Sequence, residues 1–188
     1  MRVTLKSGII FAFGWILIKL SMFGMGVSSA DSLKPSVLLN MLFLILAVTV
    51  GLYLQKRKDS ESGNVLKDIK NGMTAGLPYA ILVSLSIYIY YAKVDPDYIQ
   101  GKLEDTEVEL TKVMNNPKEY KKLKDSNPDF EVMTDKQITK AVLKNSRSAY
   151  NPKSTAIMAL SALILYALLN SIFITVILRK LVFKQIQK

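Results

Sequence analysis

The sequence predicts an all-α integral membrane protein with four transmembrane helices and a helical extracytoplasmic insertion between the third and the fourth. Half of the 188 residues are hydrophobic, and they gather in four blocks, at about 8–27, 36–54, 74–92 and 155–178. A helix rises about 1.5 Å per residue, so about 20 residues cross a hydrocarbon core about 30 Å thick. Apart from Lys19, none of the blocks contains a charged side chain. Uncharged runs of this length are typical of membrane-spanning helices.

The distribution of basic residues predicts the orientation of these helices. The segments before the first block, between the second and third, and after the fourth carry eleven basic side chains: Arg2, Lys6, Lys56, Arg57, Lys58, Lys67, Lys70, Arg179, Lys180, Lys184 and Lys188. Because basic residues flank the cytoplasmic ends of spanning helices, we expect both termini in the cytoplasm. The net charge of +10 thus comes mostly from membrane-flanking residues. We expect contact with the lipid bilayer and no nucleic-acid partner.

The first block also has features of a cleaved signal peptide. A basic start is followed by an apolar stretch and by small residues at 28–30. The apolar stretch continues for about eight residues beyond Lys19, whereas the apolar region of a signal peptide usually runs about 7–15 residues. This favours a retained helix over a signal peptide, whose removal would leave three spans.

Lys19 is the charged residue inside the predicted spans. It follows Gly8 by eleven residues, or about 16 Å of helix, which predicts a position near the middle of the membrane. Three interpretations are open. The ammonium reaches an interface along its stem, meets hydroxyl groups of Ser84, Ser86 or Ser161, or pairs with a carboxylate of another membrane protein.

Prolines and tyrosines mark the second and third blocks. Pro35 precedes the second block, where a first-turn position is expected. Pro78 lies about one turn inside the third block and predicts a kink, because proline removes a backbone donor. Tyr88, Tyr90 and Tyr91 close that block and predict an aromatic belt at the outer interface.

The connection 93–153 predicts a helical cap. VDPDY at 94–98 is typical of a helix start. A stripe follows at spacings of four and three, formed by the apolar residues Ile99, Leu103, Leu110 and Val113 with Thr106 between them. Asn115–Pro117 predicts the end of this helix, and Thr134 with Gln137 predicts a capping box for a helix ending near Asn145. The stripe either packs an acidic helix onto a basic partner within the cap, or binds another protein.

Catalytic chemistry has little support. The chain has no cysteine and no histidine, which excludes thiol nucleophiles and imidazole acid–base catalysis. Carboxylates that are close in sequence gather in the connection: Asp95, Asp97, Glu104, Asp105, Glu107 and Glu109. Their spacing fits the solvated face of a helix better than a paired acid–base or metal site. We expect no enzyme activity, no cofactor and no metal.

Several of these features occur together in a known family. The stretch KDIKNGMTAGLPYAILVSLSIYIYY followed by VDPDY resembles the second half of DUF4199-like proteins, small four-helix membrane proteins of Bacteroidota with unknown function. The similarity includes Gly76, the tripeptide Pro96-Asp97-Tyr98 and the basic ending Leu178-Arg179-Lys180. The resemblance implies the fold and a bacterial inner membrane, and it brings no reaction.

Two functional hypotheses follow. The first is an accessory or scaffold subunit of a membrane assembly, with a partner membrane protein that explains Lys19. The second is a small transporter or channel that self-associates. Proton-coupled exchange usually requires an intramembrane carboxylate, and the four apolar blocks contain none, which favours the first hypothesis.

Overall fold

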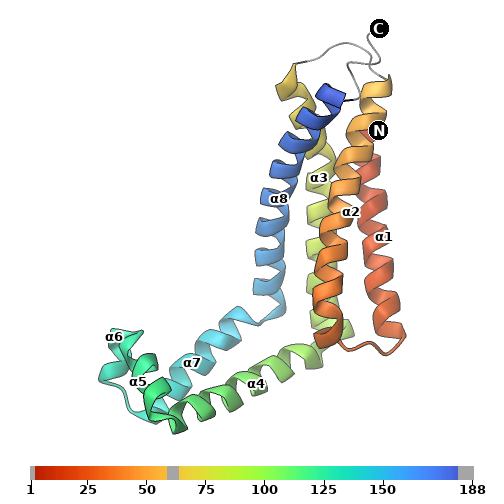
Figure 1. Ribbon diagram of the computed structural model, residues 1–188. Coiled ribbons are helices and arrows are strands. Elements are labelled where there is room, and N and C mark those ends of the chain that lie inside the picture. The colour runs from red at the N-terminus through yellow and green to blue at the C-terminus, as the bar shows by residue number, and fades with distance from the viewer. Residues whose placement is uncertain (1–2, 59–63, 182–188) are drawn as a thin grey trace. The chain divides into compact units, whose positions relative to one another are not determined.

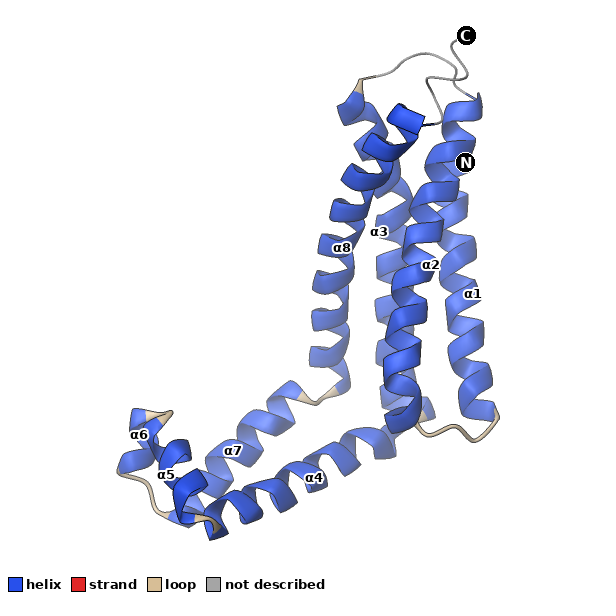
Figure 2. Ribbon diagram, in the orientation of Figure 1, coloured by secondary structure: helices blue, strands red, loops and turns tan. Residues whose placement is uncertain are grey.

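The protein is all-helical over the residues that the computed structural model describes, 3–58 and 64–181, and no strand occurs among them (Figure 2). Four helices are long and apolar enough to cross a membrane. They are α1 (Val3–Gly24), α2 (Ser29–Lys58), α3 (Val65–Ile89) and α8 (Pro152–Leu181) (Figure 1). The predicted fold class is therefore confirmed. Of the basic residues counted above, Arg2, Lys184 and Lys188 lie outside the described residues.

The helices extend beyond most boundaries predicted from the apolar blocks. The largest difference is at α3, which begins at Val65 rather than at 74, and α2 begins at Ser29 rather than at 36. The Ser28 hydroxyl accepts the Asp31 backbone N–H at 3.1 Å and donates to the Asp31 carboxylate at 2.7 Å, and this supplies an N-terminal cap. Pro35 consequently lies inside the helix, and its predicted first-turn position is wrong. The length of an apolar block matches the thickness of the hydrocarbon core, whereas capping residues determine where the helix begins. A helix can therefore begin before its apolar block.

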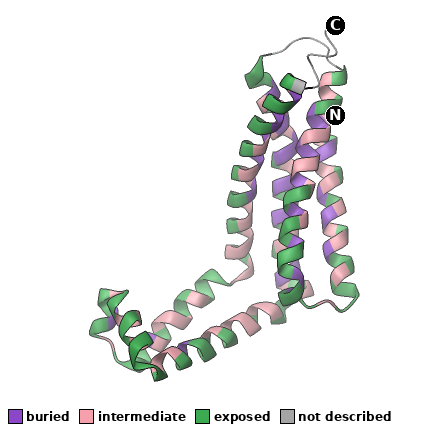
Figure 3. Ribbon diagram, in the orientation of Figure 1, coloured by how far each residue is buried: buried purple, intermediate pink, exposed green. Residues whose placement is uncertain are grey.

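The chain divides into two compact units, residues 1–87 with 156–188, and residues 88–155. In the first unit, buried residues line the facing sides of the four long helices (Figure 3). Fully buried members of this core are mostly small or β-branched: Ala12, Leu44, Ala47, Val48, Ala75, Tyr79, Ala80, Val83 and Ala167. Large apolar side chains such as Ile10, Leu38, Ile81 and Phe173 are exposed on the outside. An apolar exterior around a small-residue interior is expected of helices packed in lipid.

Three of the helices in the second unit begin in the same way. A π-helical turn, η1 (Tyr90–Val94), is followed by α4 (Pro96–Asn115), α5 (Pro117–Asp125), α6 (Pro128–Glu131) and α7 (Asp135–Ala149). The side chains of Asp95, Asn116 and Asn127 cap α4, α5 and α6, each with proline as the first helical residue. A backbone N–H at the first helical position has no acceptor within the helix. Proline suits this position because it has no N–H to leave unpaired. The predicted start and end of α4 are confirmed.

The capping box of α7 is also confirmed, since the Thr134 backbone N–H donates to Gln137 Oε1 at 2.8 Å. The helix continues four residues past Asn145, to Ala149. Within this unit α4 contacts α7, and Leu110, Phe130 and Ile138 are buried. The unit thus has a small apolar core of its own.

Tyr90 and Tyr91 do not face lipid as an aromatic belt. Both side chains are buried, and their rings meet edge to face with centroids 5.1 Å apart. Tyr91 also stacks on Tyr98 at 5.2 Å. The belt prediction is therefore wrong for these two residues, whereas Tyr88 is exposed. The π-helical turn changes the direction in which successive side chains point. A prediction that continues the α-helical spacing of the third block does not include this change.

Candidate functional site

Lys19 lies near one end of α1 and is almost completely buried, with 7% of its surface exposed. Its Nζ donates to Ser32 Oγ of α2 at 3.1 Å, and Ser32 is itself buried. α1 ends at Gly24, five residues after Lys19, so the backbone at Lys19 is about 7.5 Å from the helix end. Lys19 thus lies closer to the C-terminal end of α1 than to its middle, and its position near the middle of the membrane stays a prediction.

Lys19 of α1 contacts a polar stripe that runs along α2. Ser29, Ser32, Ser36 and Asn40 recur at spacings of three and four, and all four are buried. Two further hydrogen bonds join this stripe to neighbouring helices. Trp15 Nε1 of α1 donates to the Ser36 carbonyl at 3.0 Å. The Tyr79 hydroxyl of α3 donates to Asn40 Oδ1 at 2.6 Å and lies 3.0 Å from the Asn40 carbonyl.

The stripe therefore connects α1, α2 and α3 through buried polar contacts. Such contacts hold the helices in one register, because a polar group in an apolar interior needs its partner. Ser29 and Ser32 were not predicted to belong to a span, because they precede the apolar block at 36–54. Their helical spacing with Ser36 and Asn40 was the signal that could have identified them.

The three serines predicted to meet Lys19 have other surroundings. Ser86 Oγ donates to the Val83 carbonyl at 2.8 Å, and Ser161 Oγ to the Ile157 carbonyl at 3.0 Å. Ser161 is exposed on α8. Ser84 is buried, and its hydroxyl has no hydrogen-bond partner among the described residues.

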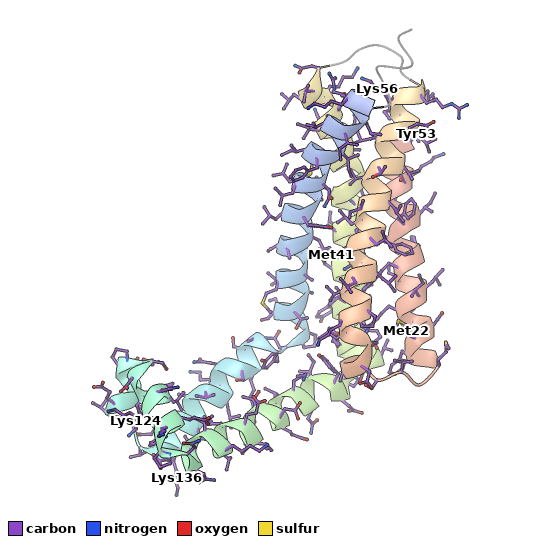
Figure 4. The ribbon with its side chains drawn as sticks, viewed as in Figure 1. Met22, Met41, Tyr53, Lys56, Lys124 and Lys136 are labelled. Carbon is purple, nitrogen blue, oxygen red and sulfur yellow. The ribbon has the colours of Figure 1, made fainter. Side chains whose placement is uncertain are left out.

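A second polar cluster, Lys56–Asp68–Arg179, lies where α2 ends, α3 begins and α8 ends, which we call the basic end of the bundle (Figures 1 and 4). Asp68 is 5% exposed. Its Oδ2 accepts Nε and Nη2 of Arg179, both at 2.7 Å. Lys56 Nζ lies 3.4 Å from each Asp68 oxygen. Charge-assisted hydrogen bonds of this kind are among the stronger polar contacts in proteins.

Asp68 was not predicted as a site residue, because it precedes the third apolar block and belongs to a segment of mixed charge. Its place on α3 inside the bundle comes from the helix beginning at Val65. Arg179 was noted as part of the basic ending, and Lys56 as part of the basic connection. The structure brings all three together.

Small residues let the helices of the bundle approach closely. A Cβ added at Gly8 of α1 would lie 2.1 Å from the Ala75 carbonyl oxygen of α3. One added at Gly76 of α3 would lie 2.6 Å from Ala167 Cβ of α8. One turn from Gly76, a Cβ on Gly72 would lie 2.7 Å from Ser171 Oγ. Distances this short leave no width for a side chain between these backbones.

The predicted interaction stripe of α4 is partly used inside its own unit. Leu110 is buried, whereas Ile99, Leu103 and Val113 are half-buried. α4 contacts α7, and Thr139 Oγ1 of α7 lies 3.6 Å from Met114 Sδ of α4. Within the unit, Lys124 and Lys136 project from the α5–α7 region (Figure 4).

The six carboxylates that gather in the connection at 95–109 do not form one site. The Asp95 side chain accepts the Tyr98 backbone N–H at 3.3 Å as the cap of α4. The other five carboxylates are exposed: Asp97, Glu104, Asp105, Glu107 and Glu109. Among residues 3–58 and 64–181, no group of three or more acidic side chains could hold a metal ion.

Comparison with protein-family models identifies the family of this chain. A family model described as "Protein of unknown function (DUF4199)" matches residues 6–180. No curated protein matches, and no solved structure matches.

Proposed function

The chain belongs to the DUF4199 family, a family of unknown function, and from that premise we propose that it is a non-enzymatic accessory or scaffold subunit of a membrane assembly. The observation that carries the proposal is the close backbone approach of α1 to α3 and of α3 to α8. Helices in direct contact at glycine have no space between them for a permeating ion. The bundle is therefore better suited to hold a position in the membrane than to conduct.

The insertion at 88–155 supports a role in assembly. It is a compact unit with its own buried residues and with charged side chains over much of its surface. α5 alone carries Lys118, Lys121, Lys122 and Lys124. A helical unit on a membrane anchor can present such side chains to a partner without changing the bundle. This arrangement supports recruitment or spacing of another component.

We further propose that the protein resides in a bacterial inner membrane with both termini in the cytoplasm. The support is the excess of basic residues at the basic end, following the positive-inside rule. Because the chain lacks cysteine, single introduced thiols report topology without background. Ser126→Cys should react with an impermeant maleimide in intact spheroplasts, whereas Asn64→Cys should react only after permeabilisation. The reverse pattern would contradict the orientation.

The scaffold proposal is tested by gentle purification of the tagged full chain from its native membrane. We expect a stoichiometric membrane-protein partner, detected by size determination and mass spectrometry, that remains bound through a second purification step. A protein that is recovered as a partner-free monomer while its native lipids are retained would refute the proposal.

The alternative is a homo-oligomeric transporter or channel. The observation that favours this alternative is the buried Lys19 near the end of α1. An ammonium near a membrane surface can attract an anion. Lys19→Met in proteoliposomes should abolish anion flux if this alternative holds. Lys34→Met is the matched control, because Lys34 is exposed on α2 near the same end of the bundle. Equal flux in both variants would remove the alternative.

A further inference from the structure

Helix α7 of the 88–155 unit has a basic face. Four basic side chains are exposed on it and recur at spacings of four, four and three: Lys136, Lys140, Lys144 and Arg147. Residues at these spacings lie on one side of a helix, and this face extends over about 16 Å. The acidic residue of α7, Asp135, accepts a hydrogen bond from the Tyr120 hydroxyl at the start of the helix. No carboxylate therefore interrupts the basic face of α7, a helix that is described throughout.

Helix α4 of the same unit has an acidic face of similar length. Five carboxylates are exposed on it over about 18 Å of helix: Asp97, Glu104, Asp105, Glu107 and Glu109. Val108 lies among them and is 53% exposed. Counting every charged side chain of each helix, α4 carries a net charge of −3 and α7 a net charge of +3. The two helices are therefore equal and opposite in formal charge.

The two charged faces do not neutralise each other within one copy of the chain. α4 contacts α7, and the buried residues Leu110 and Ile138 lie on the sides of these helices opposite to the charged faces. Across residues 88–155, all of which are described, no ion pair joins a carboxylate of α4 to a basic residue of α7. The pair Lys102–Asp105, at 3.5 Å, lies within α4 itself. Both faces thus remain open to a partner.

We propose that the acidic face of α4 in one copy binds the basic face of α7 in a second copy. A basic face alone would fit any acidic partner, but the same chain also supplies an acidic face of matching length and opposite charge. Different faces of the two copies meet, so the contact is head-to-tail and can repeat into a ring or a row. Copies in one membrane carry their insertions on the same side, which raises the effective concentration of each face for the other.

This inference goes beyond the proposed scaffold role, because a second copy is a different partner from another membrane protein. It is tested on the purified chain alone. A failure to associate with itself would therefore leave the scaffold proposal standing, and the absence of another partner would leave this inference standing.

Charge reversal on either helix separates association between copies from effects inside one copy. Lys140→Glu with Lys144→Glu makes the face of α7 acidic, and Glu104→Lys with Glu107→Lys makes the face of α4 basic. Each double variant alone presents like charges to its own copies. In a mixture of the two, the reversed α7 of one meets the reversed α4 of the other, and the two unaltered faces also meet.

The matched control reverses two charges away from both faces. Lys118→Glu with Lys122→Glu has the same spacing of four residues and changes the net charge by the same amount as the α7 variant. Both lysines are exposed on α5. A general effect of net charge would appear in this control, whereas a specific contact between α4 and α7 would not.

The assay is energy transfer between donor- and acceptor-labelled full chains in phosphatidylcholine vesicles at increasing lipid dilution. The dyes are attached at Asn64→Cys, outside the insertion. We expect each reversed variant to weaken self-association about tenfold or more, because opposed charges become like charges. The mixture of the two should associate within about twofold of the wild type, and the α5 control should change by less than about threefold.

A mixture that associates no better than either reversed variant alone would overturn the proposal. So would a wild type that stays monomeric in phosphatidylcholine while its α7 face captures phosphatidylglycerol vesicles, since the occupant would then be anionic lipid. Should a reversed variant not purify as a single species, the wild type decides. Its association should weaken between about 0.05 and 0.5 M sodium chloride, and association that is independent of salt would refute the contact.

Discussion

Gly8→Ala is expected to destabilise the bundle, because among the described glycines Gly8 leaves the least space for an added methyl group. The added methyl group would lie 2.1 Å from the Ala75 carbonyl oxygen, 3.0 Å from the carbonyl carbon and 3.2 Å from the Ala75 Cα. All three atoms belong to the backbone of α3, so no side-chain rotation relieves the overlap. α1 and α3 would have to separate by roughly 1 Å to restore normal contact distances.

The expected cost follows from two opposing terms. Overpacking of a close interface costs about 1–3 kcal/mol. The higher helix propensity of alanine returns up to about 1 kcal/mol. We therefore expect Gly8→Ala to lower the free energy of unfolding by about 1–2 kcal/mol. Gly51→Ala should cost less, because its nearest contacts are 3.3 Å.

The assay is unfolding by sodium dodecyl sulfate in mixed micelles, followed by the fluorescence of the single tryptophan. Trp15 lies on α1 with 4% of its surface exposed, so it reports the loss of this packing. Gly24→Ala is the matched control, since it lies on the same helix and its added methyl would meet nothing within 4 Å. If Gly8→Ala is as stable as Gly24→Ala, the close contact between α1 and α3 is refuted.

Three further outcomes are expected from single contacts. Tyr79→Phe removes the hydroxyl that donates to Asn40 and should cost about 0.6 kcal/mol and at most about 1.7; an unchanged unfolding midpoint would contradict that bond. A double-mutant cycle of Lys19→Met and Ser32→Ala should give a coupling of about 0.5–1.5 kcal/mol for their hydrogen bond, and strictly additive effects would argue against it. Ile138→Ala removes a fully buried side chain from the 88–155 unit and should cost that unit about 2–5 kcal/mol. Hydrogen exchange should then rise in α4 and α7 while tryptophan fluorescence stays unchanged, and a fluorescence change would contradict the independence of the two units.

Local patterns predicted the helices of the second unit well. Asp95–Pro96 and the pair Thr134 and Gln137 begin helices where the sequence indicated, because a cap involves residues only two or three positions apart. Tyr91 was predicted less well. Its direction depends on the π-helical turn and on stacking with Tyr98 seven residues later, which no helical count from the preceding span includes.

Polar sites were the least predictable feature. The sequence indicated that Lys19 needs polar surroundings, but it suggested three serines in later helices instead of Ser32. The error came from the expected start of α2, which placed Ser32 outside the span. Asp68 was missed for a similar reason, because α3 begins nine residues before the predicted third block and so includes this carboxylate in the bundle.

The sequence by itself determined that this is a four-span, all-helical membrane protein with a helical insertion. Apolar length, flanking charge and capping residues act over short distances along the chain, so they can be read without knowing which helices meet. Only the tertiary structure decided the pairings. Lys19 and Ser32 are 13 residues apart, and Asp68 and Arg179 are 111 apart. Such contacts depend on the register between helices, which close approach at Gly8 and Gly76 establishes across the bundle.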